Sequence, residues 1–243
     1  MSLSLYKNIS FILNQFYIKF KIYIKIEIDN ILNIIVTLMI RNMEKITVSN
    51  LNLIECIRWA INKPNKLVKI PEKTIREQKK EKQEQEKEWG NIIIGQKGNG
   101  QWTTLLGENL VFEILKLKGE NPKKTEVRGG FKPDIETDDY IYEVKTSSWW
   151  VDGTAGEKVL GTWIKYQNVK ELFEGKPLRI VCVANQEWEL EYGKVKYFGD
   201  EITEKTKKAL DLAREWGIEY IRFSDLISDV NYNDVNYNDV NYK

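Results

Sequence analysis

Histidine is absent from this sequence of 243 residues. Its absence excludes catalytic triads that need a histidine, nucleases that bind metal through histidine, and zinc sites that require imidazole ligands. Carboxylates are plentiful, with 36 Asp and Glu residues. Metal-dependent chemistry on carboxylate ligands is therefore the hydrolytic route that the composition leaves open.

Cysteine and net charge are scarce as well. Cys56 and Cys182 lie far apart in apolar runs, so we expect buried free thiols in a reducing compartment, and hence an intracellular, cytoplasmic protein. The formal net charge is only +1 at pH 7. Because this gives no overall basic signal, DNA binding requires a local basic patch.

Long hydrophobic runs are also missing. The apolar run at 31–40 is shorter than the ~20 residues that a membrane helix needs, and the N-terminus shows no signal-peptide cleavage pattern. We therefore expect no membrane partner, with a membrane anchor as the minority alternative. Residues 1–42 are rich in Ile, Lys and Asn, which suggests an AT-rich genome of bacterial or viral source. This extension is predicted to be of doubtful order, and a start of translation at Met43 is the alternative.

Residues 43–100 are predicted to form a helical arm. A short helix begins at Ser49 or Asn50 and ends before Pro64, and a highly charged helix follows at 72–89. Positive and negative charges nearly cancel in the charged helix, which favours a solvated helix with i,i+4 ion pairs. An arm that lies along DNA is the alternative. Glycines at 95, 98 and 100 predict a flexible linker and a domain boundary.

The C-terminal residues 229–243 form a repeat tail. The unit Asp-Val-Asn-Tyr-Asn repeats in steps of five residues and ends in Lys243. Such a repeat cannot bury a core, so the tail is predicted to be disordered.

The stretch from Phe131 to Lys145 sets an aspartate, a glutamate and a lysine where one hairpin can bring them together. Alternate side chains of a strand share a face, so Glu143 and Lys145 point the same way. The turn formers at 137–139 predict that 133–136 pairs antiparallel with the strand that follows. An even number of loop residues, or a bulge, then places Asp134 on the face of Glu143 and Lys145.

This constellation suits phosphodiester cleavage. Two carboxylates a few ångströms apart repel each other unless a cation lies between them. Mg²⁺ characteristically binds one or two carboxylates together with water and phosphate oxygens. Lys145, on the same face, can orient or activate the attacking water or balance charge on the phosphate.

Pro133-Asp134 followed by Glu143-Val144-Lys145 resembles the PD-(D/E)XK signature of a nuclease superfamily that includes type II restriction endonucleases. The resemblance covers about residues 101–227, and we place a nuclease core at 101–228. It implies a restriction-endonuclease-like αβββαβ core, which is an α/β fold with a mixed central sheet flanked by helices. It also implies that Asp134, Glu143 and the Val144 carbonyl hold Mg²⁺, that Mn²⁺ substitutes for it, and that Lys145 serves the attacking water.

Further site residues come from the flanking elements. Glu108 lies on the predicted first core helix, and it matches the acidic residue that nucleases of this superfamily often carry beside the metal, as a further catalytic and metal-binding group. Basic residues near the helix predicted from 162, and amides after the buried strand predicted at 178–184, are candidates for contact with DNA. These candidates are Lys158, Lys165, Tyr166, Gln167, Asn185 and Gln186.

The sequence thus predicts a Mg²⁺-dependent DNA endonuclease, of the type II restriction kind, that cuts double-stranded DNA at a specific site. The resemblance implies a homodimer and a cognate DNA methyltransferase that acts on the same site. Two alternatives remain open. One is a repair or recombination nuclease of the same superfamily, such as a Holliday-junction resolvase, and the other is a non-cleaving DNA-binding protein with a relic site.

Overall fold

The computed structural model describes residues 48–151 and 159–228, with side chains from Leu53 onward. The predicted N-terminal extension at 1–42, the repeat tail at 229–243 and the candidate DNA contact Lys158 lie outside the described residues. No helix of the described part is long and apolar enough to cross a membrane.

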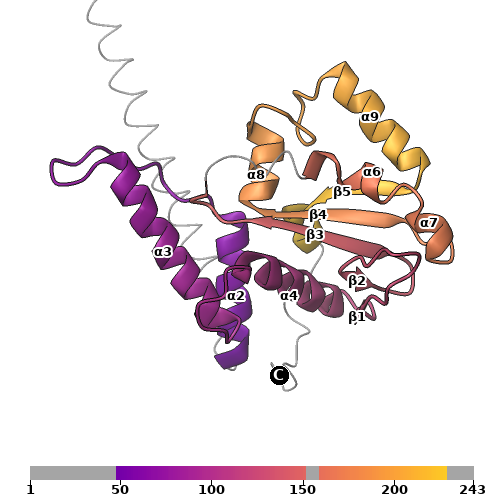
Figure 1. The fold of residues 1–243 in the computed structure, drawn as a ribbon, viewed down its shortest axis with the longest axis horizontal. Coiled ribbons are helices and arrows are strands. Elements are labelled where there is room, and N and C mark those ends of the chain that lie inside the picture. Colours follow the sequence, from indigo (N-terminus) through magenta and orange to yellow (C-terminus); the bar gives the residue numbers. More distant parts are fainter. Residues whose placement is uncertain (1–47, 152–158, 229–243) are drawn as a thin grey trace, which may run out of the picture. The chain divides into compact units, whose positions relative to one another are not determined.

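Helices and strands follow one another along the chain as Figure 1 shows. The first elements are α2 (Val48–Ile61), α3 (Ile75–Ile93), α4 (Trp102–Leu117), β1 (Lys123–Lys124), β2 (Ile135–Glu136) and β3 (Ile141–Ser147). The later ones are α6 (Thr162–Lys165), α7 (Val169–Leu172), β4 (Leu178–Ala184), α8 (Asn185–Tyr192), α9 (Glu204–Glu215), β5 (Ile218–Arg222) and α10 (Phe223–Ser228). The chain therefore belongs to the expected α/β class.

The five described strands form one sheet in the order β1-β2-β3-β4-β5. The strands β1, β2 and β3 pair antiparallel, whereas β4 and β5 continue the sheet parallel to β3. A parallel pair needs a crossover connection, which α6 and α7 provide before β4, and α8 and α9 before β5. The prediction of a mixed sheet flanked by helices is confirmed.

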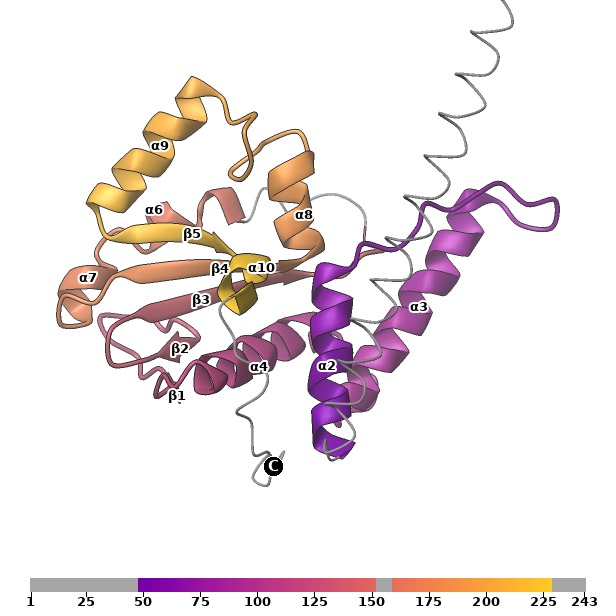
Figure 2. The ribbon, with the colours of Figure 1, turned by 180° about the vertical axis from the view of Figure 1, so that it is seen from behind.

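Each face of the sheet carries its own hydrophobic cluster. On one face α2, α4 and α10 pack against Tyr142 and Val144 of β3. On the other face α6, α7 and α9 cover Ile141 and Ile180. Figure 2 shows α4 and α9 on opposite sides of the strands. Strand β4 contributes to both clusters and is almost wholly buried, as its continuous apolar run predicts.

Two segments differ from the prediction. The helix expected to begin at Gly161 or Thr162 and to end at Gly175 is interrupted at 166–168 and forms the separate short helices α6 and α7. The sequence at 191–198 also predicts a short hairpin, but the segment after β4 begins with helix α8 and residues 193–198 form no strand. Ala184 adopts a φ of 57°, a conformation that L-residues rarely take, and this turns the chain abruptly from strand into helix.

Helices α2 and α3 are joined to the sheet through buried contacts. A Cβ atom on Gly90 would lie only 2.0 Å from the Trp102 ring, so the glycine permits the close approach of α3 to α4. Glu86 of α3 is 8% exposed and accepts hydrogen bonds from Trp59 Nε1 (2.8 Å) and the Trp149 backbone N–H (3.0 Å). Residues on both sides of the glycine-containing segment at 95–100 thus contribute to one buried cluster.

Candidate active site

The hairpin between β2 and β3 has the even loop that the site requires. The Thr137 N–H donates to the Tyr140 carbonyl (2.9 Å), which leaves Asp138 and Asp139 as a two-residue loop. The residue pairs Glu136↔Ile141 and 135↔142 follow from it. The predicted antiparallel pairing is thus confirmed at residues 135 and 136, which make up the whole of β2.

Asp134 occupies the edge of β3 just beyond the last paired residue of β2. Its backbone N–H donates to the Tyr142 carbonyl (3.0 Å), and its Oδ2 accepts a hydrogen bond from the Val144 N–H (2.7 Å). The N–H and carbonyl of a strand residue face the same neighbour. The Val144 carbonyl therefore points toward the edge at which the Asp134 carboxylate lies, where β2 no longer pairs.

Glu143 is held by hydrogen bonds on both carboxylate oxygens. It is 4% exposed; Oε1 accepts from Lys145 Nζ at 2.5 Å and Oε2 from the Tyr166 hydroxyl at 2.8 Å. Lys165 Nζ donates in turn to the same tyrosine oxygen (3.0 Å). Burial and the adjacent Glu143 carboxylate raise the pKa of Tyr166, so this hydroxyl stays protonated and donates.

The site carries an excess of negative charge. Burial, with the negative charges of Glu143 and Glu108, raises the pKa of Asp134 to about 7, against the opposing effects of the Val144 N–H and Lys145. A carboxyl group with this pKa is short of positive charge. Asp134, Glu143, Lys145 and Glu108 are thus close enough to influence one another, as predicted.

Glu108 reaches the site because α4 approaches β3 closely. A Cβ atom on Gly107 would lie 1.8 Å from Thr146 Oγ1, so only glycine permits this contact. The Glu108 side chain is mostly buried and forms an ion pair with Lys124 Nζ at 2.9 Å. A glycine inside an apolar helical pattern was the sequence signal for this close contact, and it was missed.

The donor set can be compared with what a hard divalent cation requires. No group of three or more acidic or thiol side chains suited to a metal ion occurs among the described residues. The Asp134 and Glu143 carboxylates and the neighbouring Val144 carbonyl are oxygen ligands of the kind that Mg²⁺ takes, with water and substrate completing the shell. Burial and the neighbouring Glu143 carboxylate raise the pKa of Asp134, and a cation bound between the two carboxylates would relieve their repulsion, so the residues fit such an ion.

The predicted DNA contacts fall into two groups. Lys165 and Gln167 are exposed. Tyr166 and Gln186 are 1% and 2% exposed, and Asn185 is 9% exposed, so their side chains are not at the surface. Tyr166 instead orients Glu143, a role that its sequence position in a broken helix did not reveal.

No protein-family model, curated protein or solved structure matches this chain.

Proposed function

We propose that this protein is a Mg²⁺-dependent DNA endonuclease that hydrolyses phosphodiester bonds in double-stranded DNA. The observation that carries the proposal is the meeting of Asp134, Glu143 and Lys145 along the central strand β3, with the pKa of Asp134 raised to about 7. Perturbed carboxyl groups gathered beside a lysine are typical of sites that work on charged substrates.

The order of elements supports the same proposal. Helix α4, three antiparallel strands, a helical crossover and the parallel strand β4 follow the order αβββαβ of the restriction-endonuclease-like core. The antiparallel pairing brings Asp134 beside Glu143, and α4 adds Glu108. The fold thus supplies each acidic residue from the element that the resemblance to PD-(D/E)XK nucleases implies.

Each residue has a distinct role in this proposal. Asp134, Glu143 and the Val144 carbonyl would hold Mg²⁺, or Mn²⁺ in its place, and Glu108 would assist. The ion when bound would polarise the phosphate and lower the pKa of a bound water. Lys145 would orient the attacking water and balance the charge that builds on the phosphate. Tyr166 keeps the Glu143 carboxylate fixed by its hydrogen bond.

The first test uses Lys145→Ala with plasmid DNA and Mg²⁺. Loss of the lysine should reduce cleavage by more than about a hundredfold, the effect typical of removing one electrostatic group from a hydrolytic site. The matched control is Lys132→Ala, an exposed lysine just before Asp134, which should cleave nearly as the wild type. A Lys145→Ala protein that keeps wild-type cleavage contradicts the proposal.

A second test measures metal binding without relying on activity. Mn²⁺ should raise the thermal midpoint of the wild type because it binds the folded site. The same titration of Asp134→Asn should give little or no shift. Defined bands from linear duplex DNA would then favour a type II restriction enzyme, whereas cutting of branched DNA alone would favour a junction resolvase.

A further inference from the structure

The charges of α3 are sorted by helix face. Arg76, Lys80 and Lys87 are separated by four and seven residues, close to one and two turns of ~3.6 residues each, so they share one flank. Four glutamates fill an adjacent stripe, at positions 77, 81, 84 and 88. The near-zero net charge of the segment thus conceals one basic and one acidic stripe.

The three basic residues, called here the basic stripe, have no ion-pair partner among the described residues. Arg76 and Lys80 are exposed and Lys87 is half-buried. An ion pair at the start of this helix joins Lys73 Nζ and Glu81 Oε1 (2.6 Å), outside the stripe. Like charges stand at i,i+4 in Arg76–Lys80 and Glu84–Glu88, which costs helix stability. The three residues of the basic stripe therefore take no part in the expected i,i+4 ion pairs.

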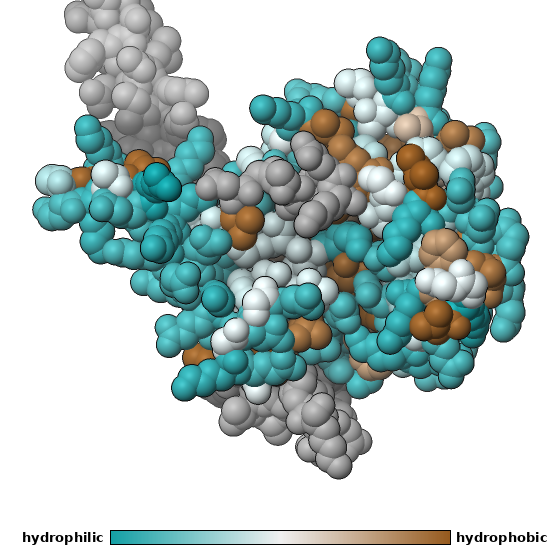
Figure 3. Space-filling model, in the orientation of Figure 1, coloured by the Kyte–Doolittle hydropathy of each residue, from teal (hydrophilic) through white to brown (hydrophobic). Residues whose placement is uncertain are grey.

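The stripe is held in a fixed position relative to the candidate active site. Glu86 points to the core side of α3 and accepts the Trp149 N–H, two residues after the end of β3, the strand that carries Glu143 and Lys145. Trp89 adds a hydrogen bond to Glu55 of α2 (2.6 Å). The helix is thus anchored along its C-terminal half, whereas its N-terminal half is exposed and hydrophilic (Figure 3).

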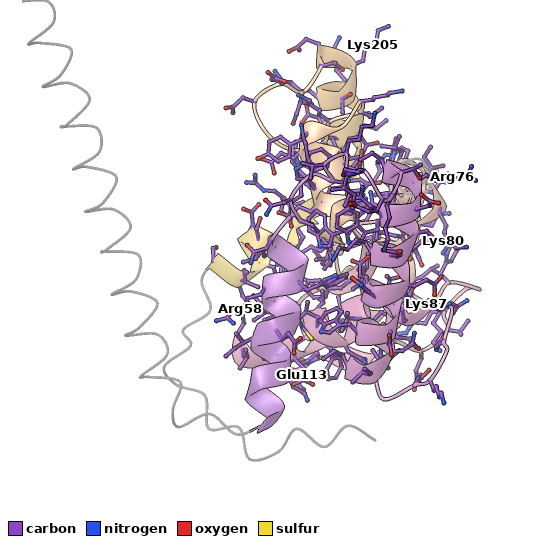
Figure 4. All side chains as sticks on the ribbon, turned by 90° about the vertical axis from the view of Figure 1, so that its left-hand side faces the viewer. Arg58, Arg76, Lys80, Lys87, Glu113 and Lys205 are labelled. Atoms are coloured by element: carbon purple, nitrogen blue, oxygen red, sulfur yellow. The ribbon has the colours of Figure 1, made fainter. Side chains whose placement is uncertain are left out.

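The three side chains of the basic stripe lie on one flank of α3. Figure 4 shows Arg76, Lys80 and Lys87 along the flank of α3 that points away from α2. Helix α10, which follows β5, contacts α2, and β1 and β2 form the opposite edge of the sheet from β5. The basic stripe therefore lies on the flank of α3 opposite α2, the helix that contacts α10 and β4.

We infer that the basic stripe of α3 binds the phosphate backbone of the duplex that the candidate active site cleaves. This inference rests on the proposed function. Unpaired Arg and Lys side chains over about 16 Å of helix match a run of phosphates along one DNA strand. Such contacts fix the position of DNA without reading its sequence. The acidic stripe, on the outer face, limits how DNA can lie against the helix.

The test compares two variants that change the net charge equally. One replaces Arg76, Lys80 and Lys87 by Gln, and the control replaces Lys194, Lys205 and Lys208, exposed lysines of α9 and the loop before it. Figure 4 shows Lys205 at a distance from the stripe. Binding of the full chain to a linear duplex is measured in EDTA at several salt concentrations, with helix content as a check of folding.

The stripe variant should bind about tenfold to a hundredfold more weakly at ~0.1 M salt, and the slope of log K against log salt should fall by about 2 to 3. The control variant should keep nearly the wild-type slope. An unchanged slope in the stripe variant, an equal loss in both variants, or no duplex binding by the wild type overturns the inference.

Cleavage of the same duplex in Mg²⁺ separates this inference from the proposed function. If the wild type cleaves and the stripe variant binds the duplex normally, only the role of the stripe is overturned and the proposed function stands. A wild type that binds through the stripe but never cleaves overturns the nuclease assignment and leaves the stripe as a DNA-binding surface.

Discussion

Two carboxylates two residues apart, Glu136 in β2 and Asp134 just before this strand, have opposite electrostatic surroundings. Glu136 is 2% exposed and meets Lys176 (2.8 Å), Arg128 (3.2 Å) and Lys123 (3.9 Å). Asp134 meets two other carboxylates and one lysine. The pKa of Glu136 is lowered because hydrogen bonding and attraction from Lys176 and the other cations outweigh the effect of its burial, while that of Asp134 is raised. Matched cations offset the burial of Glu136, whereas at Asp134 the proposed Mg²⁺ would supply the positive charge that the protein itself does not.

The largest expected effect is on stability, at Glu136. Glu136→Gln should lower the free energy of unfolding by about 3 kcal/mol at pH 7, because Lys176 and Arg128 lose their buried partner. Since the folded pKa of Glu136 is below its usual 4.5, this stabilisation is present above pH ~4.5 and is lost as the pH falls through the folded pKa. Urea unfolding at pH 7 measures it.

The matched control is Glu219→Gln, which removes a half-exposed partner 3.8 Å from Arg179. This change should cost less than about 0.5 kcal/mol. Equal losses for the two variants would mean that Glu136 has no special structural role.

Asp134 should show the reverse behaviour. In EDTA, Asp134→Asn should raise the free energy of unfolding by about 1–2 kcal/mol at pH 8, because the charged carboxylate is costly in the folded site. Its folded pKa, about 7, is above the usual 3.8, so native stability is favoured below pH ~3.8 and is lost as the pH rises through 7. The difference between variant and wild type should therefore grow from pH 4 to pH 8.

Asp138→Asn, at an exposed position of the hairpin loop, serves as the control. It should leave the free energy of unfolding within about 0.5 kcal/mol at both pH values. If Asp134→Asn is no more stable than the wild type at pH 8, the site does not lack positive charge in the way described.

The surroundings of Asp134 and of Glu136 also show which features of the site the sequence can predict and which it cannot. Two consecutive turn-forming aspartates were enough to predict an even loop and the antiparallel pairing of β2 with β3, because hairpin register depends on local residues. The cations around Glu136 come from 123, 128 and 176, and no local pattern specifies their meeting. Tyr166 likewise meets Glu143 across 23 residues, through a crossover whose interrupted helix was predicted as continuous.

Tyr166 allows a more moderate effect on activity to be tested. Tyr166→Phe removes the hydrogen bond to Glu143 Oε2 and keeps the buried ring. We expect cleavage about tenfold slower, corresponding to a charged hydrogen bond of about 1.5 kcal/mol, with unchanged affinity for duplex DNA. Single-turnover cleavage and binding in EDTA separate the two quantities.

Tyr192→Phe is the control, since Tyr192 is 59% exposed on α8, and it should leave both quantities unchanged. Weaker DNA binding by Tyr166→Phe, with a normal rate of cleavage, would instead favour a direct role in substrate contact.

The smallest effect on stability and cleavage is expected at Lys124. Comparing it with its partner Glu108 distinguishes a surface ion pair from a residue of the active site. Its side chain is 54% exposed and pairs with Glu108, which is 17% exposed. Lys124→Gln should change the free energy of unfolding by less than about 0.5 kcal/mol, because exposed pairs contribute little, and cleavage should remain close to the wild-type rate. Glu108→Gln removes the other partner of the same ion pair, but it also removes negative charge beside Asp134. If Glu108 belongs to the active site, only this second variant slows cleavage markedly; equal rates for the two variants would confine Glu108 to the ion pair.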